Sequence, residues 1–182
     1  MIRIQMKNIY NFILFQALWL YTVLGVAKNN LWPAIIIFSG FAILFLFSDY
    51  SHKTDKKLFV FCIFTGVIVD SILAKSRLVE YQQNIGYENI APYWILLLWG
   101  GFALTLNHSM SWMLRKPKVA YSFITIGAPL SYFSASKLGA VDIPNMLNAF
   151  LMISLLWLIT YHSIVLFQSH FSEAKVKCND LS

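Results

Sequence analysis

The sequence predicts an all-α membrane protein, a polytopic bundle of about six transmembrane helices with both termini in the cytoplasm. Three observations predict this class. Of the 182 residues, 58% are hydrophobic and only 12% are charged, whereas soluble domains are about 45–50% apolar and about 25% charged. The apolar residues form runs of about 20 residues, the length that crosses a bilayer as a helix. The basic residues gather on alternate connections between these runs.

The runs predict a single integral membrane domain over residues 1–182, with no room for a separate soluble domain of about 50 residues or more. They lack the alternating polarity of membrane β-strands, so helices are expected. Pro129 falls inside the fifth run, where its missing N–H must free the carbonyl of Thr125 and kink the helix. The expected spans are, in chain order, residues 9–27, 32–47, 58–75, 92–112, 119–136 and 146–168.

The positions of lysine and arginine predict the orientation. The N-terminal segment, residues 48–57, residues 115–118 and the tail after 168 carry ten of them, and the remaining connections with their flanks carry four. Cytoplasmic loops are the richer in basic residues, so both termini are expected in the cytoplasm. The same pattern indicates that the net charge of +6 serves to orient the protein in the membrane and to contact anionic lipid headgroups. Membrane lipids are therefore the expected partners, and nucleic acid is not.

Asp70 is the strongest functional candidate and the one catalytic candidate. It lies inside the third run, slightly beyond the midplane at about 1.5 Å of rise per residue, where an ionisable side chain costs at least about 2.5–3.5 kcal/mol. Ser131 and Tyr132 are expected at a similar depth and could contact Asp70. Lys75, five residues further along the chain, is also an expected partner of Asp70. Two interpretations stay open: a proton relay, general base or cation ligand, or a structural carboxyl group bonded to hydroxyl groups.

A second polar layer of Gln16, Asn107 and His108 is expected nearer the cytoplasmic end, where LTLNHSMSW (104–112) closes the fourth run. On a continuous helix Thr105, His108 and Ser109 share one face and Asn107 points nearly opposite. Bonding between helices is an open alternative for these side chains. The substrate-binding candidates of both layers, with two deep tryptophans, are Gln16, Trp19, Asp70, Trp99, Thr105, Asn107, His108, Ser109 and Tyr132.

Metal and cofactor sites are not expected. The spacing of Asp49, His52 and Asp55 could hold a metal ion, but these residues lie in a lysine-flanked stretch that is typical of a solvated loop. The sequence contains no nucleotide-binding glycine motif, no HExxH and no GxSxG.

Four motifs carry a resemblance to a known family. They are NFILFQALWLYTVLG (11–25), GVIVDSILA (66–74), PYWILLLWGGFALTLNHSMSWM (92–113) and GAPLSYFSASKLGAV (127–141). In this order they resemble a family of small multi-pass bacterial inner-membrane proteins that is known only as a domain of unknown function. The resemblance implies a location in the bacterial inner membrane. It also implies a setting of membrane-lipid modification, because members are often encoded near cyclopropane-fatty-acid-synthase-like genes.

The leading hypothesis is therefore a protein that binds or processes a lipid or fatty-acyl substrate, and whether it catalyses a reaction stays open. A lipid-modifying enzyme or a second copy of the chain would then be its protein partner. The first alternative is a small proton-coupled transporter that uses Asp70 as its titrating group. The second is a structural or assembly factor of a membrane complex, in which the polar side chains only join helices.

Overall fold

The structure is a computed structural model that describes residues 2–47, 49–83 and 89–179, with side chains between residues 6 and 170 of these ranges. The regular secondary structure of the described chain is helical apart from one antiparallel pair of two-residue strands, which confirms the predicted all-α class. The elements are α1 (Ile2–Ala27), α2 (Trp32–Leu46), α3 (Asp55–Lys75), β1 (Glu80–Tyr81), α4 (Ile95–Ala103), α5 (Ser111–Arg115), α6 (Pro117–Lys137), β2 (Val141–Asp142) and α7 (Met146–Asn179).

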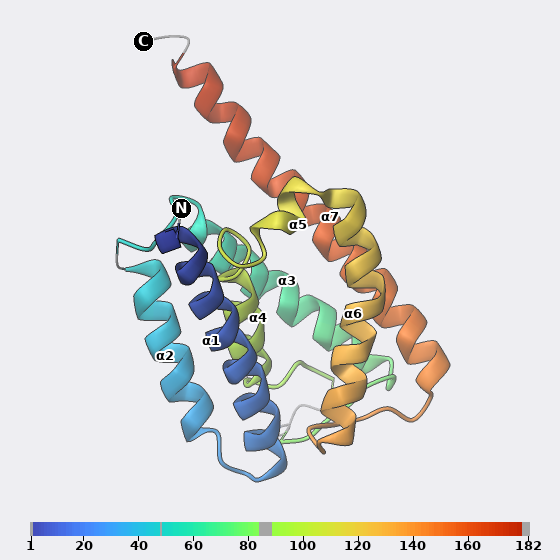
Figure 1. Cartoon of the computed structure of the whole chain (residues 1–182). Helices are drawn as coiled ribbons and strands as arrows, with labels where there is room; N and C mark the ends of the chain where they lie inside the picture. Colours follow the sequence, from blue (N-terminus) through green and yellow to red (C-terminus); the bar gives the residue numbers. More distant parts are fainter. Residues whose placement is uncertain (1, 48, 84–88, 180–182) are drawn as a thin grey trace.

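The helices run alternately between two ends of a bundle (Figure 1). One end, here called the terminal end, holds the start of α1, the α2–α3 connection, α5 and the last turns of α7. The opposite end, here called the strand end, holds the α1–α2 turn, the strand pair and the α6–α7 connection. Helix α1 packs on α2 and α6 packs on α7, while α3 and α4 lie between these two pairs.

The outer faces of the helices are apolar. Trp32, Ile36, Phe64 and Leu147 are each about 70% exposed, and soluble proteins rarely expose large contiguous apolar surfaces. Within the described residues, three helical segments are long and apolar enough to cross a membrane. The protein is therefore a membrane-associated helical bundle. The three segments are Met6–Ala27, Asp55–Lys75 and Met146–His170.

The fourth expected span, 92–112, is not one helix. Helix α4 ends at Ala103, residues 104–110 form turns, and α5 begins at Ser111. The N–H of Thr105 donates to the carbonyl of Phe102 at 2.9 Å, and the N–H of Met110 donates to Thr105 at 2.9 Å, so the regular i→i−4 pattern is lost. The face predicted for Thr105, His108 and Ser109 is therefore wrong, because it assumed a continuous helix.

Pro129 has the expected local effect within α6. It lies inside the helix and has no N–H to donate to the carbonyl of Thr125. The hydroxyl group of Ser154 on α7 donates to that carbonyl instead, at 2.8 Å. The proline thereby converts a bond within one helix into a bond between α6 and α7.

Candidate functional site: two buried carboxylate centres

Asp70 lies on α3 with 0% of its surface exposed, and its carboxylate accepts three hydrogen bonds from three other segments. Oδ1 accepts from the hydroxyl groups of Tyr81 and Tyr132, each at 2.6 Å. Oδ2 accepts from the indole N–H of Trp99 at 2.6 Å. These donors belong to β1, α6 and α4 respectively. Asp70, Tyr81, Trp99 and Tyr132 are called the Asp70 centre.

The three donors satisfy a carboxylate that has no access to water. Removing a carboxyl group from water costs several kcal/mol unless hydrogen bonds satisfy it, and the three bonds at 2.6 Å supply these partners. Burial, together with the nearby Asp70 carboxylate, raises the pKa of the Tyr81 hydroxyl group well above its usual range. Tyr81 therefore keeps its proton at neutral pH and acts as a donor to Asp70.

Trp99 is held between a helix backbone and a second tryptophan. Its ring stacks on that of Trp157, with centroids 4.5 Å apart and an interplanar angle of 15°. On its other side lies Gly66 of α3, where a Cβ atom would fall 2.2 Å from the nearest atom of the Trp99 ring. The absence of a side chain at Gly66 therefore permits the approach that places the Trp99 N–H on Asp70.

Gly66→Ala is expected to destabilise the protein by about 1–3 kcal/mol, the usual effect of overpacking. The added methyl group would push the Trp99 ring off α3 and lengthen its bond to Asp70, so the tryptophan emission spectrum should also change. Gly40→Ala is the matched control, because a Cβ atom there meets nothing within 4 Å and alanine favours a helix by up to about 1 kcal/mol. Equal unfolding free energies for the two variants would contradict this account of Gly66.

A cavity of about 90 Å³ lies beside the Asp70 centre. It adjoins a wider groove of about 320 Å³ between α1 and α6, here called the lateral groove. Apart from Asp70, two tyrosines and a serine, the lining of the cavity is apolar or tryptophan. The residues that line both spaces are Phe15, Trp19, Phe102, Ser131 and Trp157.

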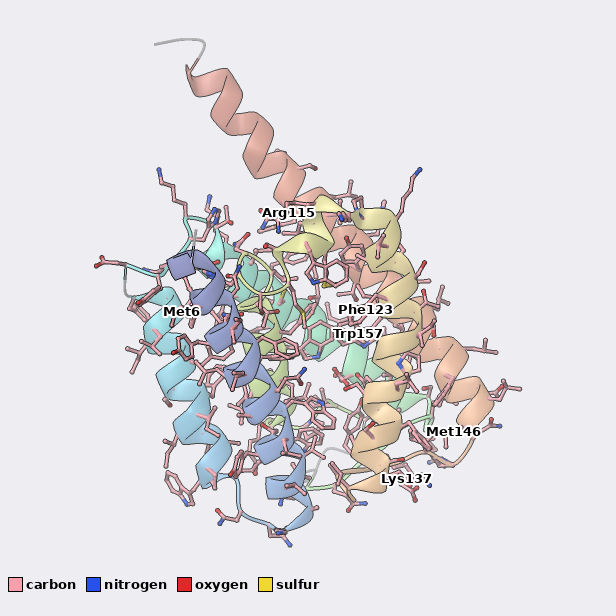
Figure 2. The ribbon with its side chains drawn as sticks, in the orientation of Figure 1. Met6, Arg115, Phe123, Lys137, Met146 and Trp157 are labelled. Carbon is pink, nitrogen blue, oxygen red and sulfur yellow. The ribbon has the colours of Figure 1, made fainter. Side chains whose placement is uncertain are left out.

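The lateral groove opens between exposed side chains and has tryptophan in its lining. Gln16 of α1 and Phe123 of α6 are exposed and line the groove, and Figure 2 labels Phe123 and Trp157 near the middle of the bundle. The indole N–H of Trp19 donates to the hydroxyl group of Ser131 at 3.0 Å, which joins α1 to α6. The indole nitrogen of Trp157 is buried near the Tyr132 hydroxyl group and forms no hydrogen bond of good geometry among the described residues.

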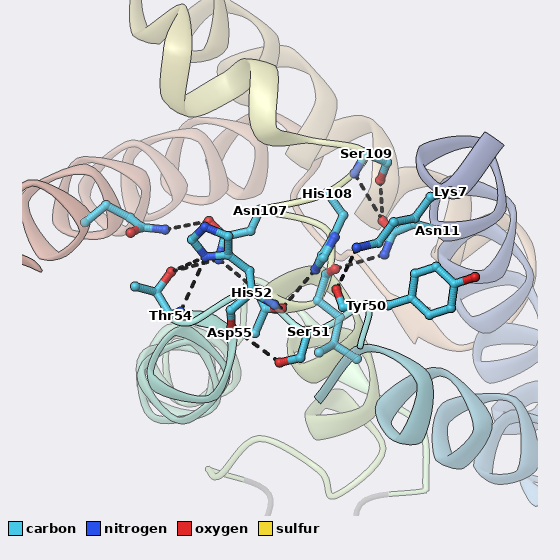
Figure 3. A network of polar contacts seen from close by, with 12 residues as sticks. Lys7, Asn11, Tyr50, Ser51, His52, Thr54, Asp55, Asn107, His108 and Ser109 are labelled. Carbon is cyan, nitrogen blue, oxygen red and sulfur yellow. Dashed lines mark hydrogen bonds and ion pairs between the residues drawn. The ribbon is translucent and has the colours of Figure 1, made fainter. Parts of the chain in front are cut away.

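A second buried carboxylate lies at the terminal end (Figure 3). Asp55 is 0% exposed, and its Oδ2 accepts from the backbone N–H of His52 at 2.6 Å and lies 2.9 Å from Nε2 of His108. Its Oδ1 accepts from the side-chain amide of Asn107 at 2.8 Å. Asp55, Asn107 and His108 are called the Asp55 centre. The prediction of a solvated loop is wrong for Asp55, because the turns at 104–110 cover the start of α3.

The other polar side chains of this stretch attach the broken helix to its neighbours. The amide of Asn11 on α1 donates to the carbonyl of Leu104 at 3.0 Å, and its oxygen accepts from the hydroxyl group of Ser109 at 2.6 Å. On the opposite side, Gln168 of α7 donates to the side-chain oxygen of Asn107 at 2.9 Å. Buried backbone outside regular helices needs hydrogen-bond partners from elsewhere in the protein, and Asn11 supplies one for the carbonyl of Leu104.

The nine predicted binding residues therefore separate into two places. Asp70 and Asp55 are fifteen residues apart on α3, which is about 22 Å of helix. Gln16 lines the lateral groove instead of joining His108, and the hydroxyl group of Thr105 donates to Phe102 in its own turn at 2.6 Å. Around the cavity lie Trp19, Asp70, Trp99 and Tyr132, and at the terminal end lie Asn107, His108 and Ser109.

Two contributors were missed and one expected partner is absent. Tyr81 lies in the connection between α3 and α4, for which no role was predicted, and no sequence motif marks it. Asp55 could have been paired with His108, because both were expected near the same end of the bundle. Lys75 is exposed at the end of α3 and forms no salt bridge with Asp70.

Comparisons with known proteins place the chain in a family without assigning it an activity. No curated protein and no solved structure matches the chain. A family model described as "Protein of unknown function (DUF2878)" matches residues 8–162, a range that contains both carboxylate centres. This match confirms the resemblance stated from the four sequence motifs. The chain therefore belongs to the DUF2878 family of proteins of unknown function.

Proposed function

We propose that the protein binds the acyl chain of a membrane lipid in the lateral groove, with the polar end of that lipid directed to the Asp70 centre, and that it acts in membrane-lipid modification in the bacterial inner membrane. The observation that carries the proposal is that the groove and the cavity beside Asp70 share five lining residues. A ligand that entered between α1 and α6 would therefore reach the cavity beside the Asp70 centre.

The size and chemistry of the groove suit an apolar chain. Its volume of about 320 Å³ lies at the lower end of the range of about 300–1,000 Å³ for small-molecule sites, which combine apolar walls with a few polar groups. An unsatisfied buried N–H costs about 1–3 kcal/mol. The N–H of Trp157, which forms no hydrogen bond of good geometry among the described residues, would donate to an ester or carboxyl oxygen of the bound lipid.

The proposal includes six membrane crossings, with α4, the turns at 104–110 and α5 together forming the fourth. The terminal end would face the cytoplasm, because it has the larger share of basic residues. This orientation would place the lateral groove within the bilayer, so that a chain could enter it without crossing water. The exposed basic side chains at the terminal end include Lys53, Lys56, Lys57, Arg115, Lys116 and Lys118.

Photo-crosslinking tests lipid binding in this groove. The full-length protein would be placed in liposomes that contain a phosphatidylethanolamine with a diazirine at the middle of one acyl chain, and the labelled peptides would be mapped by mass spectrometry. Met110 and Met113, which line the groove, should be labelled in excess over Leu151 and Leu155, which are exposed on α7.

Two tryptophan variants provide the matched control. Ala128 lines the groove and is 9% exposed, whereas Ile126, two residues away on α6, is 63% exposed and is not part of the lining. Ala128→Trp should fill the groove and abolish the excess labelling, and Ile126→Trp should leave it unchanged. Uniform labelling of groove and outer surface, or equal effects of the two variants, would reject the groove as a lipid site.

The role in lipid modification needs a separate measurement. Lipid profiles would be compared between the parent strain, a deletion strain and a strain that carries Asp70→Asn. A change in both altered strains would support a role that depends on Asp70, and a change in the deletion strain alone would remove Asp70 from that role. Unchanged profiles in both strains would reject lipid modification, even if the cross-linking had shown that a lipid binds.

A further inference from the structure

A second groove lies at the terminal end, between α1 and α2, and shares no lining residue with the lateral groove. Its volume is about 470 Å³, and it is called the terminal groove. Its walls are apolar except for one lysine and two tyrosine hydroxyl groups. The lining residues are Met6, Lys7, Tyr10, Ile13, Leu14, Leu44, Phe45 and Tyr50.

Lys7 provides the positive charge of this groove. Its ammonium group donates to the carbonyl of Tyr50 at 2.7 Å, and lies 5.0 Å from the centroid of the Tyr50 ring and 5.9 Å from that of Phe45 (Figure 3). An ammonium group has three N–H donors, so this bond leaves two for a ligand. Among the described residues Lys7 forms no salt bridge, and the carboxylate of Asp55 is already bonded to Asn107 and His108.

The positions of the charged and apolar residues in the terminal groove match those of the headgroup and acyl chain of a phospholipid. Lys7 lies in the second turn of α1, and Leu14 lies seven residues further along the helix, which is about 10 Å. The charged group therefore lies nearer the end of the bundle, and the apolar walls continue from it along α1. Five of the lining residues, Met6, Tyr10, Ile13, Leu44 and Tyr50, are 42–57% exposed, so a chain could reach the groove from the surrounding lipid.

We propose that the terminal groove binds an anionic phospholipid, with the phosphate against Lys7 and one acyl chain along the α1–α2 walls. Charge complementarity selects this occupant over a neutral lipid. The other charged side chains exposed at this end are mostly basic, with Asp49 as an acidic exception, and anionic headgroups are attracted to such clusters. This site is independent of the proposed function, because it uses neither the lateral groove nor the Asp70 centre.

Native mass spectrometry of the full-length protein in detergent tests the proposal. The protein would be titrated with phosphatidylglycerol and, separately, with phosphatidylcholine of the same acyl chains. Phosphatidylglycerol should bind more tightly, and Lys7→Gln should weaken its binding about fivefold while leaving phosphatidylcholine unchanged, as expected for one lysine at an anionic headgroup. Lys118→Gln is the control, because Lys118 is exposed on α6, outside the groove, and should leave both affinities unchanged.

A further variant separates the chain site from the headgroup site. Ile13→Trp should reduce the binding of phosphatidylglycerol without altering the charge, because the indole group would occupy part of the acyl path. Equal binding of the two lipids to the parent protein would overturn the proposal. So would an equal loss of phosphatidylglycerol binding in Lys7→Gln and Lys118→Gln, since general attraction to the basic end would then explain the binding.

Discussion

Asp70→Ala is expected to lower the free energy of unfolding by at least about 3 kcal/mol, because three donors would lose their acceptor at about 1–3 kcal/mol each. The reason lies in the three donors that would remain. Tyr81, Trp99 and Tyr132 each direct a buried or part-buried donor at the carboxylate, and a donor without an acceptor costs about 1–3 kcal/mol. Equilibrium unfolding in mixed micelles, followed by circular dichroism, measures the change.

Asp70→Asn and Tyr132→Phe measure what the Asp70 carboxyl group contributes to the free energy of unfolding. The asparagine keeps one acceptor oxygen for the tyrosines but turns an amide N–H₂ towards the N–H of Trp99, so it should destabilise less than alanine does. Because Asp70 and Tyr132 are bonded directly at 2.6 Å, a double-mutant cycle of these two changes should show a coupling of about 0.5–3 kcal/mol. A change below about 0.5 kcal/mol for Asp70→Ala, typical of surface sites, would show that the centre does not hold β1, α4 and α6 to α3.

The Asp70–Tyr132 contact could be predicted because both residues lie in long apolar runs, where depth follows from a constant rise of about 1.5 Å per residue. The contact with Tyr81 could not be predicted in this way. Tyr81 is placed by pairing with Val141, sixty residues further along the chain, and two-residue strands leave no periodic pattern in a sequence. The depth of a residue along a helix therefore predicts contacts between two helices, but it does not predict contacts made by residues in the connections.

The sequence predicts that the side of α1 with Asn8, Phe12, Phe15 and Trp19, flanked by Asn11 and Gln16, faces inward, because amides facing lipid are unfavourable. The structure differs from this prediction for another physical reason. Asn11 is 0% exposed, whereas Phe12 is 46% exposed and Gln16 is also exposed, so the inward face differs from the expected one. A helix that is apolar on all sides gives a weak rotational signal. Asn11 faces inward because the carbonyl of Leu104, freed where α4 ends, needs a donor, and that need is visible only once the break in the fourth span is known.

The second large loss of stability is expected at the Asp55 centre, because this centre joins the start of α3 to the turns that follow α4. His108→Ala should destabilise the protein by about 3–5 kcal/mol, the range for breaking a buried pair, since it removes the imidazole that lies 2.9 Å from the fully buried Asp55 carboxylate. His52→Ala is the matched control. The His52 ring is exposed and bonds to Thr54, while its backbone N–H, which the substitution retains, makes the bond to Asp55. A loss within about 0.5 kcal/mol is therefore expected for the control.

Replacing Asp55 and His108 together distinguishes a single buried pair from a wider anchoring role. Where a buried ion pair acts alone, two apolar residues in its place often restore stability. Asp55 also accepts from the part-buried backbone N–H of His52 and from the part-buried amide of Asn107, and this amide has a second acceptor in the Thr54 hydroxyl group. Asp55→Leu with His108→Leu would therefore leave the His52 N–H without its acceptor, and the double variant should remain less stable than the parent by about 1–3 kcal/mol. Full recovery in equilibrium unfolding would reduce the centre to one ion pair, whereas persistent loss would show that the carboxylate holds the discontinuous helix in place.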